Sequence, residues 1–253
     1  MRLYFCRLIL HDNVFFATRE MGELYETGNY LHNWALSYAF FADEFISSPY
    51  SCLGESAQTP SYLKNVRERS LLALNQEGIY LFPGKPILWS YQINTFKAAQ
   101  TNYYAKVEKF GEGSASKNYP ANIGRAKELA IGSIYHSFLV IEEDKKLPSF
   151  IARKAEQIWI RLGKWSSKVK VEVVPITNFR QKTGRFICHH PVNPLDLGPR
   201  VRVLLYDRVV MCPCSLLSTA EMEGEYWEIN SNVFSPEPVF LPCHVGYGYG
   251  GTE

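Results

Sequence analysis

Residues 161–168 (RLGKWSSK) concentrate side chains that can hold a phosphate-bearing ligand. Gly163 tolerates a positive φ and lets a backbone approach closely, while exposed amides and the hydroxyls of Ser166 and Ser167 can donate to phosphate oxygens. Trp165 offers a plane on which a base can stack. The alternative is a glycine that ends a helix among basic residues, which leaves the tryptophan and the serines unexplained. We therefore predict ligand contact by Arg161, Gly163, Lys164, Trp165, Ser166, Ser167 and Lys168.

Two further stretches carry basic groups that can reach the same ligand. Residues 15–22 (FFATREMG) follow a predicted strand, and Arg19 can contact a phosphate while the phenylalanines pack beneath it. Pairing of Arg19 with Glu20 or Glu23 explains that stretch equally well. Residues 178–185 (NFRQKTGR) either clamp the polyanion or form a solvated turn. The basic residues concerned are Arg19, Arg180, Lys182 and Arg185.

The distribution of charge favours a phosphate-bearing partner, although the 253 residues carry a net charge of only +2. Residues 145–208 hold fourteen Lys and Arg against four Asp and Glu, whereas residues 209–253 hold six Glu and no Lys or Arg. A basic block of this kind is the electrostatic footprint of a polyanion or a solvated basic face. The acidic segment matches no binding motif, and we expect it to face a basic neighbour.

A metal-independent endoribonuclease is the enzymatic alternative. Cleavage of RNA without a metal needs a base for the 2′-hydroxyl and a cation for the developing phosphorane charge. His11 ends the first predicted strand, and His32, His136, Tyr4 and Tyr25 are the other candidates. No second group stands at a telling spacing from His11, and a single histidine more often satisfies a local hydrogen bond. We therefore expect no catalysis.

The cysteines bear on both metal binding and location. Four of the six lie after residue 187 near three histidines, and such groups can hold zinc. None of these cysteines are separated by two residues as in a zinc ribbon, so we predict no metal and no cofactor. Free thiols, no visible signal peptide and no apolar run of about 18 residues indicate a cytoplasmic protein without a membrane span. The groups considered are Cys188, His189, His190, Cys212, Cys214, Cys243 and His244.

Apolar periodicity predicts alternating strands and helices over residues 1–176. Three- and four-residue steps predict a helix over 28–43 with Thr27 as its N-cap and a second over 149–163 that opens after Pro148. Alternating or β-branched runs predict strands at 2–12, 79–82, 86–97, 133–142 and 168–176. The resulting order predicts an α+β chain with a ferredoxin-like, RNA-recognition-motif (RRM) core.

The remaining segments lie outside this core. Residues 103–130 contain few residues that favour a helix or a strand, so we expect this segment to leave the core as a loop-like excursion. After residue 176 the chain is β-rich, with strand-like runs at 200–212 and 225–229. We therefore expect a core over 1–176 and a smaller β-rich region over 177–253.

The exposed face of such a sheet commonly binds RNA and is another candidate surface. That use needs aromatic side chains on the central strands, where Tyr4 with Tyr135 or Phe138 can serve. The flanking loops carry more charge than this face, so we place the main contacts in the loops. Because one fold hosts many functions, the fold alone does not decide between these alternatives.

Two segments resemble a known family. The N-terminal pattern HD-x-x-FFATREMG-x-LYET followed by LHN, together with IRLGKWSSKVKV, resembles the Cas-five-type subunit of the CRISPR type I-D effector complex, the "Csc one" family. The resemblance extends over the whole length and the order of elements. The second run also resembles the glycine-rich loop of the repeat-associated RNA-binding (RAMP) superfamily, placed between the second helix and the last strand.

The resemblance implies a non-catalytic crRNA-binding subunit of the Cascade surveillance complex in antiviral defence. Such a subunit grips the 5′ handle of the guide RNA, caps a filament of Cas-seven-type backbone subunits and adjoins the Cas-ten-type large subunit near the PAM-proximal duplex. Direct contact with target DNA is left open, and precursor processing is expected from a separate nuclease. A β-hairpin thumb over the guide would match residues 98–130, with basic residues Lys97, Lys106, Lys109, Lys117, Arg125 and Lys127.

Overall fold

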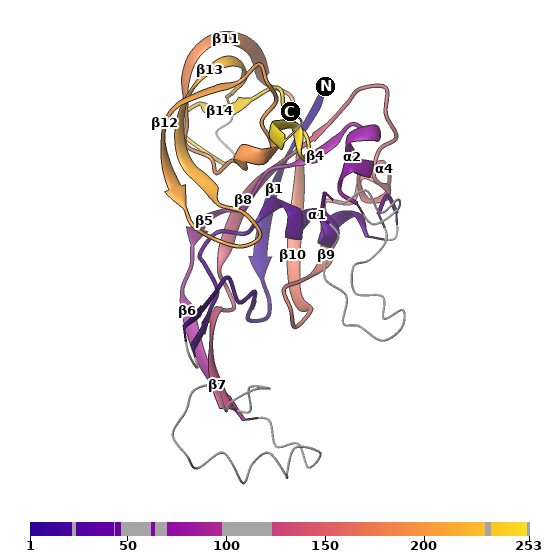
Figure 1. The fold of residues 1–253 in the computed structure, drawn as a ribbon. Coiled ribbons are helices and arrows are strands. Elements are labelled where there is room, and N and C mark those ends of the chain that lie inside the picture. The colour runs from indigo at the N-terminus through magenta and orange to yellow at the C-terminus, as the bar shows by residue number, and fades with distance from the viewer. Residues whose placement is uncertain are drawn as a thin grey trace.

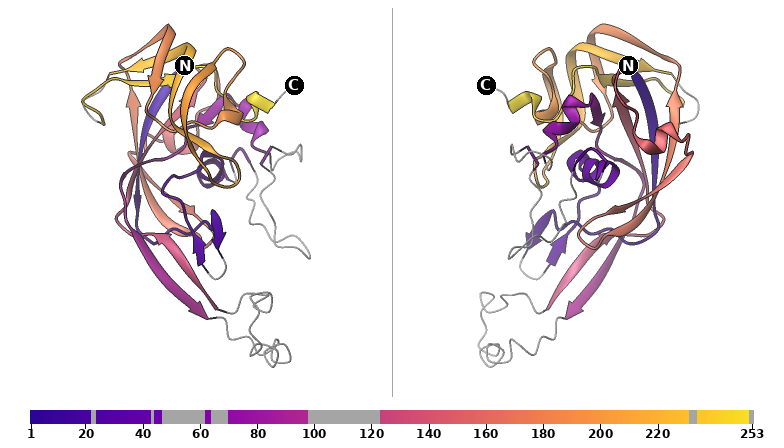
Figure 2. Two further views of the ribbon diagram at one scale, coloured as in Figure 1. Left: turned by 60° about the vertical axis from the view of Figure 1, so that its left-hand side comes forward. Right: turned by 90° about the vertical axis from the view of Figure 1, so that its right-hand side faces the viewer.

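The computed structural model is a mixed α+β chain made mostly of strands, which form three sheets within the part that it describes (Figure 1). No helix in that part is long and apolar enough to cross a membrane. The two ends of the chain lie toward the same end of the molecule (Figures 1 and 2). The described residues are 1–21, 24–42, 44–46, 62–63, 70–97, 123–230 and 234–251.

The main sheet has its first strand at the centre, antiparallel to a neighbour on each side. One more strand pairs along its far edge, and two short strands share the opposite edge. Across the sheet the strands are β4 (Ile79–Leu81) and β5 (Lys85–Leu88), which pair one after the other along the same edge of the next strand, then β8 (Ile134–Ile141), β1 (Arg2–Leu10), β10 (Ser167–Ile176) and β9 (Gln157–Leu162).

Alternation along the central strands separates a buried face from an open one. Cys6 and Leu8 on β1 and Val171 on β10 are fully buried on one side of the sheet, as the period of two requires. The helix of this region is α1 (Asn33–Phe41). The helix is shorter than the predicted 28–43 and its N-cap is His32, whose Nδ1 accepts from the amide of Trp34 at 3.2 Å. Figure 2 shows α1 packed against one side of the sheet.

The predicted helix over 149–163 is wrong in its second half. A short helix, α4 (Ser149–Ala152), begins where the sequence predicts, but Lys154 takes a positive φ of 53° and the chain continues as the strand β9. In a split βαβ unit another strand lies between the two parallel strands, so a ferredoxin-like sheet requires antiparallel neighbours, and both neighbours of β1 are antiparallel. The strands β4, β8, β1 and β10 lie side by side in that order, with β9 added at the far edge, and the ferredoxin-like core stays a prediction.

A second sheet projects from the end of the main sheet opposite the termini (Figures 1 and 2). Its long antiparallel pair is flanked by a parallel neighbour on one side. Of the segment 98–130, which the resemblance matches to a thumb, residues 98–122 lie outside the described part of the chain. The strands in spatial order are β2 (Arg19–Met21), β3 (Leu24–Glu26), β7 (Ile123–Leu129) and β6 (Tyr91–Lys97).

The chain after residue 176 forms the third sheet, in which a long central strand pairs with three others. Residues 178–185, predicted as a connector or turn, are instead most of a strand. The elements are β11 (Phe179–Cys188), η5 (Pro194–Asp196), β12 (Arg202–Val209), β13 (Leu216–Ile229), β14 (Val239–Pro242) and η6 (Tyr249–Gly251); α2 (Leu72–Gln76) precedes β4.

A buried carboxylate joins this third sheet to the first helix. Asp196 is fully buried and accepts from Asn33 Nδ2 at 2.7 Å and from Trp34 Nε1 at 3.1 Å. The Tyr80 hydroxyl and the amide of Gly248 donate to the same carboxylate at 3.3 and 3.0 Å. Because these donors come from three separate segments, α1, β4 and the chain near Gly248, the carboxylate fixes the C-terminal region against the core.

Candidate nucleic-acid interface

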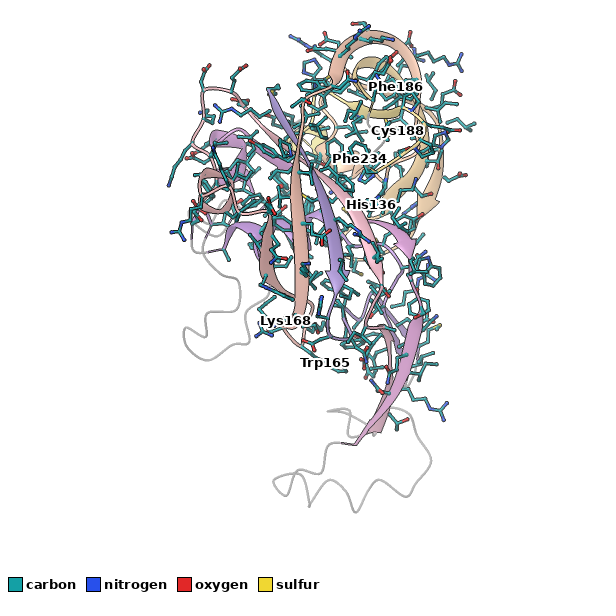
Figure 3. The ribbon with its side chains drawn as sticks, turned by 180° about the vertical axis from the view of Figure 1, so that it is seen from behind. His136, Trp165, Lys168, Phe186, Cys188 and Phe234 are labelled. Carbon is teal, nitrogen blue, oxygen red and sulfur yellow. The ribbon has the colours of Figure 1, made fainter. Side chains whose placement is uncertain are left out.

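The main sheet presents one face that none of the described helices covers, which we call the open sheet face (Figure 3). Cross-strand register places Lys168 opposite Arg161, Lys170 opposite Trp159, and Arg7 opposite Glu172, so these side chains share one side of the sheet. The open sheet face is defined by Arg7, Trp159, Arg161, Lys168, Lys170 and Glu172.

The edge of this face combines a cation with an exposed indole. The ammonium of Lys168 lies 4.1 Å from the centre of the Trp159 ring, and His11 packs edge-on against the same ring at 4.8 Å. Trp159 remains 48% exposed despite both contacts. An exposed aromatic plane beside a cation can stack a base and hold its phosphate.

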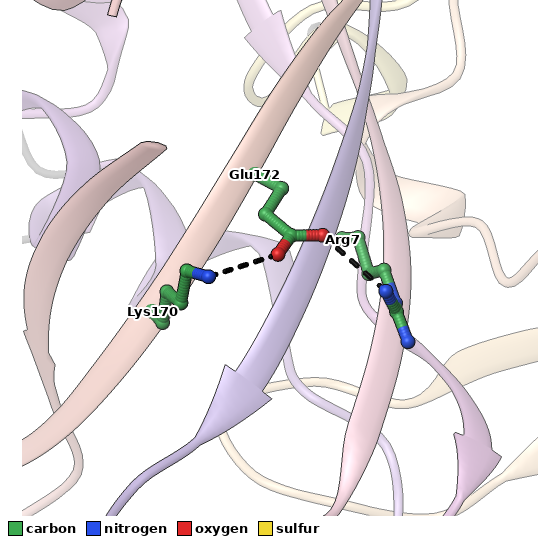
Figure 4. Close-up of polar contacts among 3 residues, drawn as sticks. All are labelled: Arg7, Lys170 and Glu172. Atoms are coloured by element: carbon green, nitrogen blue, oxygen red, sulfur yellow. Dashed lines mark hydrogen bonds and ion pairs between the residues drawn. The ribbon is translucent and has the colours of Figure 1, made fainter. Parts of the chain in front are cut away.

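One carboxylate lies among the four cations of the open sheet face. Glu172 accepts from Lys170 Nζ at 3.0 Å and from Arg7 at 3.3 Å, bridging the two strands (Figure 4). The hydrogen bond from Lys170 lowers the pKa of Glu172, aided by the charge of both cations. Glu172 therefore holds Lys170 and Arg7 in place, and the face as a whole keeps an excess of positive charge.

The glycine turn lies between β9 and β10, not between a helix and a strand. Gly163 has a φ of 81°, and a Cβ there would meet the Phe15 carbonyl oxygen at 2.8 Å. The same oxygen accepts from the amide of Lys164 at 2.8 Å. Ser167 is buried, and its hydroxyl donates to the Asn13 carbonyl at 2.6 Å. Gly163 therefore makes room for the backbone of Phe15, and the Ser167 hydroxyl already has a hydrogen-bond partner within the chain.

The rest of the turn is at the surface. Trp165 is 51% exposed and stacks on Phe15 with ring centres 4.6 Å apart. Lys164 and Ser166 are exposed, and the Ser166 carbonyl accepts from Arg161 at 3.3 Å. Figure 3 shows Trp165 and Lys168 at the same end of the sheet, so the turn extends the open sheet face.

The predicted basic residues of 178–185 lie at the other end of the molecule, on β11 (Figure 3). Lys182 pairs with Glu228, and Arg185 pairs with Glu221, both on β13. Arg180 lies opposite Glu228 in the register. The acidic C-terminal segment thus faces basic residues of its own chain, and these pairs neutralise charge that the sequence presents as free.

The remaining predicted contacts lie around the second sheet. Lys127 pairs with Glu26 at 3.0 Å and lies 4.2 Å from the Tyr91 ring centre. Arg19 donates to the Val210 carbonyl at 3.2 Å. Arg125 is exposed, and Lys97 ends β6. Lys106, Lys109 and Lys117 lie outside the described residues.

The contact residues predicted from the sequence do not include Arg7, Trp159 or Lys170. The alternation of polar and apolar residues over 157–162 could have predicted a strand with Trp159 on its outer side. The same apolar residues fit the period of a helix equally well. The predicted aromatics do not serve this face: Tyr135 is fully buried, and Phe138 is only 3% exposed. Phe5 and Arg7 lie on the same side of β1, so the alternation along the strand places Tyr4 on the other side, away from the open sheet face.

The groups proposed for catalysis or zinc binding do not gather into one site. Burial lowers the pKa of His32 to about 3, and its Nε2 contacts the Cys214 thiol at 3.2 Å. The buried Cys188 thiol donates to the His190 carbonyl, and His244 contacts Glu225 at 3.0 Å. Among the described residues no three His, Cys, Asp or Glu side chains are grouped as metal ligands are.

Comparison with known proteins identifies the family. The family model for the type I-D CRISPR-associated protein Cas5/Csc1 matches residues 1–250. A crystal structure of a CRISPR protein from Archaeoglobus fulgidus shares 13% identity at a TM-score of 0.46, covering 96% of this chain and 100% of that chain. A cryo-EM structure of the type III-B Cmr-beta bound to cognate target RNA and AMPPnP shares 9% identity at 0.42, covering 87% and 84%.

No curated protein sequence matches the chain. The match of the family model nevertheless spans nearly all of it and confirms the resemblance carried by the N-terminal motif and the glycine turn. This chain belongs to the Cas5/Csc1 family of type I-D CRISPR-associated proteins.

Proposed function

We propose that this protein binds the 5′ handle of the guide RNA through the open sheet face, as a non-catalytic subunit of the type I-D Cascade complex. The observation that carries the proposal is the placement of Arg7, Arg161, Lys168 and Lys170 on one uncovered sheet face around the exposed ring of Trp159. RNA offers both chemistries that such a face accepts, since its backbone is anionic and its unpaired bases are flat.

The exposed turn at Lys164 and Trp165 lengthens this surface along the strand direction. Its indole rests on Phe15, which leaves the outer side of the ring available for a base. The β6–β7 pair stands at the same end and serves in the proposal as the base of the thumb over the guide. Lys182 and Arg185 have no part in it, because cross-strand glutamates already neutralise them.

The family supports a place beside other Cas subunits. In this proposal the Cas-seven-type backbone subunit and the Cas-ten-type large subunit are the protein partners, and PAM-proximal DNA is the nearby nucleic acid. The guide RNA handle remains the ligand of the open sheet face itself.

A salt titration of guide RNA binding tests the proposal. The double variant Arg161→Gln/Lys168→Gln removes two charges that hold no carboxylate in the described structure. It should weaken binding on the order of tenfold at physiological salt. The slope of log K against log salt should become shallower by about 1.4, because each lost contact to a single strand contributes about 0.7.

A matched control removes the same charge from the other end of the molecule. Lys182→Gln/Arg185→Gln takes two cations from exposed ion pairs, whose loss changes stability little. This control should keep both the affinity and the salt slope of the unaltered protein. A larger loss in the control than in the sheet-face variant would overturn the proposal.

A further inference from the structure

A cleft lies where the main sheet meets the C-terminal sheet. It encloses about 440 Å³, within the range of about 300–1,000 Å³ that small-ligand sites occupy. His136 on β8 and Lys85 on β5 line one side, and Phe234 with residues of β13 and β14 lines the other. Figure 3 labels His136 and Phe234 at this junction, above the end of the sheet that carries Lys168.

Aromatic rings form much of the wall. Phe234 stacks on Phe5 with ring centres 4.5 Å apart and planes 20° apart, and it meets Phe138 edge-on at 5.5 Å. Phe138, Phe234 and Phe240 all line the cleft. A wall of fixed rings favours a flat, aromatic ligand, because stacking uses the whole face of such a ligand.

The polar groups of the cleft suit the edge of a base better than a bare phosphate. Burial, with the charges of Arg7 and Lys85, lowers the pKa of His136 to about 4, so the imidazole is neutral near pH 7. A neutral imidazole offers one donor and one acceptor. In the part of the chain that the structure describes, neither ring nitrogen of His136 makes a hydrogen bond. The hydroxyl side chains of Ser218 and Thr219 also line the cleft.

The cleft is continuous with the open sheet face. His136 lies opposite Arg7 in the register between β8 and β1, and opposite Lys85 in that between β8 and β5. Neighbouring strands are about 4.8 Å apart, so the cation row reaches the mouth of the cleft without a break. An RNA backbone lying along that row would carry its bases past the opening.

We propose that this cleft receives a single unpaired base of the RNA whose backbone lies on the open sheet face. The inference rests on the proposed function and adds a base-binding site to it. Among the described residues that line the cleft, Lys85 is the only Lys or Arg, and Glu237 adds one carboxylate to the same lining. That balance disfavours a site for free phosphate, whereas the three phenylalanines and His136 match a nucleobase.

Single abasic substitutions along the handle of the guide RNA test this site. One position should lose about tenfold in affinity when its base is removed, as a stacked base contributes. Phe234→Leu should bind the intact RNA about tenfold more weakly and should not respond to the abasic change at that position. Lys85→Gln, at a half-buried residue outside the apolar core, should weaken binding several-fold without disturbing the packing.

Phe179→Leu on β11 is the matched control, because Phe179 is a half-buried ring that does not line the cleft. It should keep the affinity and the response to abasic RNA, and thermal unfolding should show all variants folded. If every abasic position weakened binding equally while Arg161→Gln/Lys168→Gln still lowered the affinity, the base-binding site in the cleft would be overturned and the proposed function would stand. An RNA that does not bind the unaltered protein would overturn both proposals.

Discussion

Gly163 lies directly against the backbone of Phe15. The gap leaves no room for a side chain, since a Cβ would stand 2.8 Å from the Phe15 carbonyl oxygen. Gly163 also has a φ of 81°, a backbone conformation that residues other than glycine adopt only at a cost in free energy. This contact ties the β9–β10 turn to the segment after β1, and so fixes the end of the open sheet face.

We expect Gly163→Ala to lower the free energy of unfolding by about 2–4 kcal/mol, the sum of backbone strain and overpacking. Gly132→Ala is the control, because Gly132 has nearly the same φ of 82° and nothing within 4 Å of its Cβ position. The control should lose only about 1 kcal/mol. Urea unfolding measures both, and equal losses would show that the contact with Phe15 does not constrain the turn.

The sequence predicts the central strands well because their alternation is strict. The alternation of residues 168–173 places Lys168 and Lys170 outward and Val169, Val171 and Val173 inward, and β10 confirms it. The segment 149–163 fails because its apolar residues fit two periods at once. Pairing of β9 with β10, which brings Trp159 opposite Lys170, selects the strand, and no local pattern contains that information.

The free positive charge of the basic block is also wrongly predicted from the sequence, for a similar reason. Lys182 and Glu228 are 46 positions apart in the sequence, and only the antiparallel pairing of β11 with β13 brings them together. A count of charges along the chain therefore overstates the free positive surface of the basic block. The open sheet face escapes this cancellation, because Glu172 is the one carboxylate among its defining residues.

We expect no cleavage of guide or repeat RNA by the purified protein in the presence of a chelator. His11 is exposed and packs against Trp159, but no described carboxylate or carbonyl hydrogen-bonds its ring to orient it as a base. His11→Ala should therefore leave the RNA equally intact on a denaturing gel. Cleavage at a fixed position that the substitution abolishes would make this protein a metal-independent ribonuclease.

Two buried histidines make the fold sensitive to acid. Burial lowers the pKa of both His32 and His190 to about 3, whereas an unfolded chain protonates histidine near 6.5. Below pH 6.5 the unfolded state therefore binds protons that the folded state excludes, and stability is lost as the pH falls toward 3. Burial raises the pKa of Asp196 to about 6, so this carboxyl works in the opposite direction between pH 6 and 4.

The two histidines outweigh the carboxyl, and together these three groups should give a net loss of about 3 kcal/mol between pH 7 and pH 5. Each of the two histidines contributes about 2 kcal/mol at pH 5 and Asp196 returns about 1 kcal/mol. His136, whose pKa is lowered to about 4, adds to the loss in the same direction. His190→Gln keeps a donor for the Pro83 carbonyl, which His190 Nε2 contacts at 2.9 Å, and should reduce the acid loss by about 2 kcal/mol. His189→Gln, at an exposed histidine, is the control. Urea unfolding at pH 7 and pH 5 measures the loss for each variant, and equal losses would show that buried His190 is not a source of the acid sensitivity.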